Sequence, residues 1–540
     1  MLIPLLLVCA MQDSAPDSFP TLEDLRSASA LFGLEFDDGA LEQLKSEVRD
    51  RIGALERVRN IPLAWDVPMA LGFSPLVPGV ADRALELEAA EIVLPTIERP
   101  ADLQQLAFAD IPTLSTLVRS RQVSCVELTE LFLGRLATND EKLNCVVAFT
   151  EERALERAAA LDAELAEGKW RGLLHGIPYG AKDLLAVAGT PTTWGAKPYE
   201  SQVLDETASV IERLDAAGAV LVAKLSLGAL AMGDEWFRGR TNNPWNLARG
   251  SSGSSAGPAA ATAAGCVPFA IGSETLGSIV SPSTRCGNTS LRPTFGRIAR
   301  GGAMPLSWSM DKLGPMGRSA TDLAIVFDAI HGSDGIDLDA IDRPFQLSGP
   351  VDVKGWRVGF LADLVERDEA YAGTLDELRA LGVKLVAIEL PDYPVWDMML
   401  ILMAEAACSF DELTRDGRDD ELVQQGDNAW PNLFRAARFI PAVEYIRANR
   451  ARTALCREMS VVMDGVELYV HPNRGNDSLG ITNLTGHPCV IAPSGPPRGK
   501  AQPVSVCFTG ALYGEARLLA LVQAWQASTP HEEAHPPEFQ

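Results

Sequence analysis

The sequence has little positive charge for its size. Lys and Arg total 47 against 72 Asp and Glu, which gives a formal net charge of −25. Such a balance repels phosphate backbones and anionic lipid surfaces, and no run of Lys and Arg is long enough to form a basic patch. We therefore expect no nucleic-acid partner. The chain also lacks an apolar run approaching the roughly 20 residues that a membrane-spanning helix needs.

The cysteines and histidines show no ligand or disulfide pattern. The nine cysteines are scattered, odd in number and without a C-x-x-C pair, and the one H-x-x-x-H spacing among the six histidines, at His531 and His535, has no cysteine near it. Disulfide frameworks and zinc sites usually have recognisable spacings of cysteine and histidine. The sequence therefore predicts no disulfide framework and no metal site.

The two ends of the chain carry separate expectations. Residues 1–10, "MLIPLLLVCA", form a candidate signal peptide, with an apolar core but without the usual positive start. We favour export to the periplasm over a cytoplasmic location, the alternative being a frayed terminus. Residues 529–540, "TPHEEAHPPEFQ", are polar and proline-rich, so we expect a disordered tail.

Between these ends the chain divides into two regions. Residues 11–100 are expected to form an N-terminal helical extension and a connector, because residues 22–59 place apolar side chains at helical spacing and prolines follow them. No chemistry is visible there. We assign residues 101–528 to one large domain.

This domain alternates helix and strand signals. Ser124 and Glu127 form a capping box ahead of a helix, and Gly218 ends another helix just before a buried strand at 219–225. Strand, helix and strand patterns then follow one another over residues 356–390. This alternation predicts an α/β fold with a large sheet covered by helices.

The stretch "GSSGSSAGP" (250–258) has the composition of a flexible linker, yet it also matches serine-enzyme motifs. G-x-S-x-G would make Ser255 a nucleophile, but the preceding "NPWNLARGSS" shows no strand to aim it. S-x-x-K would make Ser309 a nucleophile beside Lys312, but the companion K-T-G is absent from the chain. Both matches are interpreted as chance.

A third match covers many more residues. The segment "SGSSAGPAAATAAGCVPFAIGSETLGSIVSPSTRCGNTSLRPTFGRI" (252–298) resembles the amidase signature family in the order of its two Gly/Ser loops. The segment "LLHGIPYGAKDLLAVAGTPTTWGA" (173–196), "NPWN" (243–246) and "DKLGPMGRSATDLAIVFDAI" (311–330) continue the resemblance, which runs from about Ile111 to Val522. It implies the amidase signature fold, with a large mixed central β-sheet covered by helices.

The resemblance also implies a catalytic set. Ser278 would be the nucleophile and Lys182 the base. Ser254 would pass the proton of Ser278 to Lys182, and the Gly253–Ser254 peptide bond before it would be cis. No histidine is suitably placed, and making a lysine neutral near pH 7 costs roughly 4 kcal/mol, which burial can supply. No metal or organic cofactor is implied. The oxyanion would be bound by backbone N–H groups of Thr275, Leu276, Gly277 and Ser278.

Several residues depart from the family pattern, two of them strongly. Leu276 replaces a glycine, so its backbone must avoid positive φ, and Val280 replaces an arginine whose charge commonly braces the site. The changes at Ser252 and Ala256 are milder. Because all three catalytic positions are kept, we interpret the chain as an active enzyme.

These residues predict a stand-alone amide hydrolase that forms an acyl-enzyme with a small-molecule amide. The alternatives are the glutaminase subunit of a tRNA-dependent amidotransferase, which works with partner subunits, and a scaffold that keeps the fold without turnover. A homodimer is left open. Specificity is expected from residues 404–446, where Trp430, Phe434 and Phe439 either line an apolar entrance or are ordinary core aromatics.

Overall fold

The computed structural model describes residues 20–540 except 63, 68, 83–86 and 499–501. The candidate signal peptide at residues 1–10 therefore lies outside the described residues. The chain forms two compact units, Met1–Val67 and Pro68–Gln540. The sequence placed this boundary near residue 100, but most of the proline-rich connector belongs to the second unit.

The first unit contains two helices, α1 (Leu22–Leu31) and α2 (Asp38–Arg59). Thr21 caps α1 through a capping box with Asp24. The sequence predicted one continuous helical stretch here. The structure breaks it after α1, where Gly33 has a φ of 66° that continues no helix.

The second unit is built on one large sheet. Among the described residues, 11 strands form it, with β1 and β12 at its two edges. Across the sheet the order is β1 (Val146–Phe149), β3 (Val220–Leu225), β2 (Pro178–Lys182), β8 (Phe269–Glu274), β10 (Lys312–Gly317), β9 (Thr289–Arg292), β14 (Cys489–Arg498), β15 (Gln502–Gly510), β13 (Leu468–Pro472), β11 (Arg357–Leu361) and β12 (Lys384–Ile388).

The sheet is mixed, as the α/β prediction requires. Strands β3, β2 and β8 are parallel to one another, and so are β13, β11 and β12. The neighbours from β8 through β10, β9, β14 and β15 to β13 are antiparallel. Parallel strands carry their carboxyl ends to one edge of a sheet, and this brings the ends of β2 and β8 together.

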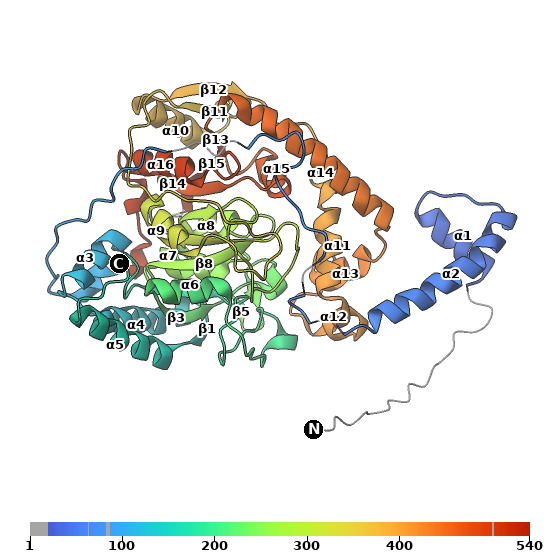
Figure 1. The fold of residues 1–540 in the computed structure, drawn as a ribbon, viewed down its shortest axis with the longest axis horizontal. Coiled ribbons are helices and arrows are strands. Elements are labelled where there is room, and N and C mark those ends of the chain that lie inside the picture. The colour runs from blue at the N-terminus through green and yellow to red at the C-terminus, as the bar shows by residue number, and fades with distance from the viewer. Residues whose placement is uncertain (1–19, 63, 68, 83–86, 499–501) are drawn as a thin grey trace. The chain divides into compact units, whose positions relative to one another are not determined.

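Helices cover the sheet, and α11, α13 and α14 gather into one group beside it, drawn in orange (Figure 1). None of the helices in the described part of the chain is both long and apolar enough to cross a bilayer. The helices of this unit are α3 (Ile111–Arg119), α4 (Cys125–Leu143), α5 (Glu151–Ala166), α6 (Ser209–Ala217), α7 (Ala256–Ala263), α8 (Val280–Cys286), α9 (Ala320–Ile330), α10 (Glu369–Ala380), α11 (Leu400–Ser409), α12 (Asp411–Arg415), α13 (Trp430–Ala437), α14 (Ala442–Val462), α15 (Ser478–Thr485) and α16 (Glu515–Gln526).

Local signals in the sequence are found where they were predicted. The capping box of Ser124 and Glu127 begins α4, and Gly218 ends α6 with a φ of 90°. The pattern over residues 356–390 becomes β11, α10 and β12, whose two strands are parallel neighbours. Each of these signals depends only on residues close together in the chain.

The prediction of a disordered tail at residues 529–540 is wrong. Phe539 is buried, and its carbonyl accepts a hydrogen bond of 2.8 Å from Nη2 of Arg135 on α4. The His535 ring stacks on Phe108 with centroids 4.0 Å apart. The polar and proline-rich composition concealed two rings that pack against the second unit.

Candidate active site

Three segments distant in sequence bring the predicted catalytic residues to one edge of the sheet. Lys182 is the last residue of β2. Ser278 lies between β8 and α8, and Ser254 lies in the loop before α7. Because β2 and β8 are parallel neighbours, the end of β2 and the loop after β8 meet at the same edge.

The Lys182 ammonium group is fully buried among serine oxygens. Its Nζ lies 2.8 Å from Ser254 Oγ, 3.0 Å from Ser255 Oγ and 2.9 Å from Ser273 Oγ. The Ser273 carbonyl oxygen is farther away, at 3.3 Å. The lysine therefore has polar contacts, but none of these partners carries a compensating charge.

Burial lowers the pKa of Lys182 to about 7, while the negative charges of Asp311 and Glu274 act in the opposite direction. Charged amines are disfavoured in a poorly solvated site, which explains the sign of the shift. A large fraction of this amine is therefore neutral at neutral pH, as a general base requires.

The sequence analysis did not identify Ser255 or Ser273 as hydrogen-bond partners of Lys182. Ser255 Oγ donates to the Ser273 carbonyl at 3.0 Å and accepts from the Ser273 N–H at 3.1 Å. With its own hydrogen committed, Ser255 can only accept from Lys182. The Ser255 hydroxyl therefore holds the amine in place and is unsuited to be a nucleophile.

One reason given for rejecting Ser255 was wrong. A short strand, β7 (Asn246–Gly250), does precede the serine loop. It pairs only with β6 (Asn242–Asn243) in a separate two-stranded sheet, so it does not aim Ser255 from the edge of the main sheet.

The loop carrying Ser254 is closely packed against another turn. The Gly253–Ser254 peptide bond is cis, as the family resemblance implies. A Cβ on Gly253 would lie 1.8 Å from the Gly233 carbonyl oxygen, so only glycine fits there. The Ser252 N–H donates to Asp234 Oδ2 at 2.7 Å and holds the same two turns together.

The loop carrying Ser278 exposes backbone donors. The positive φ falls on Gly277, at 84°, and not on Leu276, so a leucine is tolerated in the glycine position as expected. The Ser278 carbonyl accepts from the Ser255 N–H at 3.1 Å, which joins the two serine loops. Within the described residues, no protein group accepts from the N–H groups of Leu276, Gly277 and Ser278. They remain available to an oxyanion.

Glu274 anchors the beginning of α8 behind this loop. Its Oε2 accepts from the N–H groups of Ile279 and Val280 at 2.8 and 2.9 Å. Although burial acts to raise it, the pKa of Glu274 falls to about 2 because of Arg292, whose Nη1 lies 2.8 Å from Oε1. Arg292 thus places a buried positive charge behind this loop, whereas Val280 provides none.

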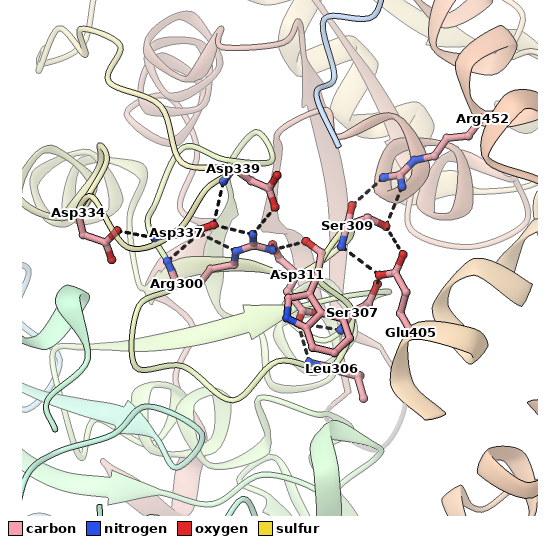
Figure 2. Close-up of polar contacts among 11 residues, drawn as sticks. Arg300, Leu306, Ser307, Ser309, Asp311, Asp334, Asp337, Asp339, Glu405 and Arg452 are labelled. Carbon is pink, nitrogen blue, oxygen red and sulfur yellow. Dashed lines mark hydrogen bonds and ion pairs between the residues drawn. The ribbon is translucent and has the colours of Figure 1, made fainter. Parts of the chain in front are cut away.

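Asp311 links the same loop to a neighbouring polar cluster. Its Oδ1 accepts from Thr275 Oγ1 at 2.5 Å, and its Oδ2 accepts from the N–H groups of Leu306 and Ser307 at 2.8 and 2.9 Å. Figure 2 shows Asp311 beside Arg300, which also pairs with Asp337. Burial raises the pKa of the Asp311 carboxyl above its ordinary value.

The residues of the S-x-x-K match have structural partners. Ser309 Oγ donates to Glu405 at 2.8 Å and accepts from Arg452 Nη1 at 3.0 Å (Figure 2). Lys312 donates to the Met310 carbonyl. These contacts agree with the interpretation of that motif as chance.

The predicted substrate contacts Trp430 and Phe434 lie inside the helical group. Their rings stack with centroids 4.8 Å apart, and Trp430 Nε1 donates to the Leu230 carbonyl at 2.9 Å. Both side chains are buried, whereas Phe439 is 63% exposed. This packing fits the alternative of core aromatics, and a contact with substrate stays a prediction.

Comparisons with known proteins show which proteins this chain is similar to. The family described as Amidase matches residues 127–474. One component of the glutamyl-tRNA(Gln) amidotransferase of Roseiflexus sp. (strain RS-1) is 32% identical over 79% of this chain and 97% of its own length. The native peptide amidase of Stenotrophomonas maltophilia superposes with a TM-score of 0.72 at 28% identity, over 81% of this chain and all 100% of that one. A bacterial aryl acylamidase of the amidase signature family shares the fold, with a TM-score of 0.70 at 21% identity over 79% of this chain and 97% of its own.

Proposed function

The chain belongs to the Amidase family, and we propose that it hydrolyses amides through an acyl-enzyme formed on Ser278. The observation that carries the proposal is the fully buried Lys182, whose pKa is about 7 and whose Nζ lies 2.8 Å from Ser254 Oγ. A neutral lysine at this distance is suited to activate a serine without histidine.

The hydrogen bonds around the lysine orient its lone pair. A neutral amine has two N–H groups, and Ser255 Oγ must accept one of them. If Ser273 accepts the other, the lone pair faces the Ser254 hydroxyl. Ser254 can then pass its proton to Lys182 and take the proton of Ser278 as Ser278 Oγ attacks the amide carbonyl carbon.

The remaining steps reuse the same groups. The N–H groups of residues 275–278 are proposed to bind the oxyanion of the tetrahedral intermediate, where losing one such donor typically costs about 3 kcal/mol. The proton held by Lys182 returns through Ser254 to the leaving amine as the C–N bond breaks. Water then attacks the acyl-enzyme, its proton follows the same route, and the carboxylic acid leaves with Ser278 restored.

Fluorophosphonate labelling followed by peptide mapping tests this assignment. We expect the label on Ser278, with labelling lost in Lys182→Ala and strongly slowed in Ser254→Ala. Ser281→Ala, in the first turn of α8, is a matched control that should label normally. A label on Ser255, or an unlabelled wild type, would refute the catalytic assignment.

One alternative within the family has its own support. The 32% identity to a component of an amidotransferase favours a glutaminase that acts together with partners. The likeness to a peptide amidase favours a stand-alone enzyme instead. Turnover of a peptide C-terminal amide by the isolated protein would support the proposal. Turnover of glutamine alone, or labelling without turnover of either substrate, would favour the partner-dependent role.

A further inference from the structure

Three potential ligands that are far apart in sequence meet in the sheet behind the candidate active site. His471 lies on β13, Cys489 on β14 and Cys507 on β15. One ligand atom from each lies within 4.8 Å of those from the other two, and all three side chains are buried. Their separation along the chain is the reason that no spacing motif predicted a metal site.

Strand register explains why they meet. His471 is directly opposite Cys507 in the antiparallel pair of β13 and β15, so both side chains point to the same face. Cys489 is opposite Thr509, two residues along β15, and therefore projects from that face as well. The two cysteines are thus diagonal neighbours, with the histidine on the far side of Cys507.

This arrangement suits a bridging ion better than a disulfide. The Cα atoms of diagonal neighbours in a sheet are roughly 7–8 Å apart, whereas a disulfide usually needs Cα atoms about 4.4–6.8 Å apart. Ligand atoms around a tetrahedral zinc, with bonds of about 2.0–2.3 Å, lie roughly 3.5 Å from one another. Small side-chain rotations within the present 4.8 Å would close such a site.

The histidine has the surroundings of a metal ligand. Its Nδ1 lies 3.0 Å from the Pro472 carbonyl oxygen, and a hydrogen bond to this acceptor places the proton on Nδ1. Nε2 then carries the lone pair, and it lies 3.0 Å from Thr509 Oγ1. A backbone carbonyl that fixes the other ring nitrogen is the usual partner of a zinc-binding histidine.

We propose that His471, Cys489 and Cys507 form a binding site for a thiophilic d10 cation, Zn²⁺ or Cu⁺. Two thiolates and an imidazole are the donors that such ions prefer over Mg²⁺ or Ca²⁺. Binding displaces the proton of each thiol, so one bound ion releases two protons. Arg292, which is opposite Cys489 on β9, places a positive charge beside the thiolates.

The site adjoins the helix that follows the candidate nucleophile. Val280, the first residue of α8, packs against Cys489, Cys507 and Ile491 in one buried cluster. A bound ion would therefore tighten the packing under α8, two residues after Ser278. The binding claim itself does not depend on the proposed hydrolysis.

Metal titration of the reduced full-length protein tests the site. Zn²⁺ is added in competition with a chromophoric chelator, and Cu⁺ is added in competition with bicinchoninate. We expect the wild type to bind one more equivalent of Zn²⁺ or of Cu⁺ than Cys489→Ser and Cys507→Ser bind. Cys408→Ser, which changes an exposed cysteine, is the matched control and should bind as the wild type.

Two further measurements keep the outcome interpretable. Cys489→Ala avoids a buried hydroxyl, and melting curves of the metal-free variants show whether they fold. Co²⁺ in place of Zn²⁺ should give a thiolate charge-transfer band that His471→Ala weakens. Equal stoichiometry in the wild type and a folded Cys489 variant, or no binding of either ion by the wild type, would overturn the proposal.

Discussion

At the scale of single residues, the proposed chemistry depends on the protonation of Lys182. Its amine is buried among three hydroxyls, and within the part of the chain that the structure describes no carboxylate pairs with it, so burial holds its pKa at about 7. The adjacent Asp183 does not pair with Lys182, because its Oδ1 lies 2.8 Å from Nζ of the buried Lys224. The two neighbouring lysines, on β2 and β3, therefore differ in their partners although both are buried.

The pH dependence of the reaction should report this amine. Since only the neutral lysine can accept a proton, kcat/KM for an amide substrate should rise with pH through about 7 and then level. Below that pH the rate should fall about tenfold per unit, following the neutral fraction. A profile that is flat between pH 5 and 8 would contradict the role of Lys182.

Asp311 provides a second test of the same electrostatics. Its negative charge acts to raise the pKa of Lys182, so Asp311→Asn should move the acidic limb of the profile to lower pH. The variant should also reduce kcat, because an amide cannot accept from Thr275 and from both N–H groups that Asp311 now binds. Exposed Asp376→Asn is the control. If the acidic limb of the profile stays at the same pH in Asp311→Asn, the charge of Asp311 does not affect the pKa of Lys182.

At the scale of elements, packing around the site rests on contacts between segments distant in the chain. Helix α13 holds the turn at Leu230 through the Trp430 indole, and Leu230 has a φ of 49° that a leucine rarely adopts. Farther along, the Gly233 carbonyl leaves no room for a Cβ on Gly253. The helical group is thus connected to the loop that carries Ser254 through one short segment.

Substitutions at Trp430 separate a packing role from a substrate role. Trp430→Phe keeps an aromatic ring beside Phe434 but loses the bond to the Leu230 carbonyl, which should cost about 1 kcal/mol of unfolding free energy. Trp430→Ala should cost about 3–5 kcal/mol. If KM is unchanged across a panel of amides while the melting temperature falls, Trp430 is a core residue. Phe439→Ala, at an exposed position, should change neither quantity.

The docked C-terminal tail makes a separate prediction. Phe539→Ala should free residues 529–540, because it removes the buried ring and leaves only the backbone carbonyl of residue 539 to bind Arg135. Hydrogen exchange of the tail amides should accelerate while the sheet stays protected, since peripheral segments open locally. Gln540→Ala is the matched control. Equal exchange in the Phe539 variant and the wild type would show that other contacts hold the tail.

At the scale of the whole molecule, the residues of the proposed mechanism all belong to the second unit, Pro68–Gln540. Deletion of residues 1–67 should therefore leave a protein that unfolds cooperatively and reacts with fluorophosphonate at Ser278. Labelling rate and thermal melting of the truncated and full chains provide the measurement. Loss of labelling in a truncated protein that still folds would assign the first unit a part in the reaction.

The sequence by itself determined the local structure and the identity of the main catalytic candidates. The cap at Ser124 and the end of α6 at Gly218 were readable because each depends on a few adjacent residues. The α/β class followed from the alternation of such signals. Lys182, Ser254 and Ser278 were identified by a motif whose spacing survives in this chain.

Only the tertiary structure decided which distant side chains share an environment. The buried pair of Glu274 and Arg292, the contact between Thr275 and Asp311 and the cluster around Cys489 each join different strands or loops. Strand order and register set these contacts, and no local pattern encodes them, because β9 and β14, like β13 and β15, are neighbours in the sheet but are not consecutive in sequence. The same reason explains why burial, and with it the lowered pKa of Lys182, required the folded chain.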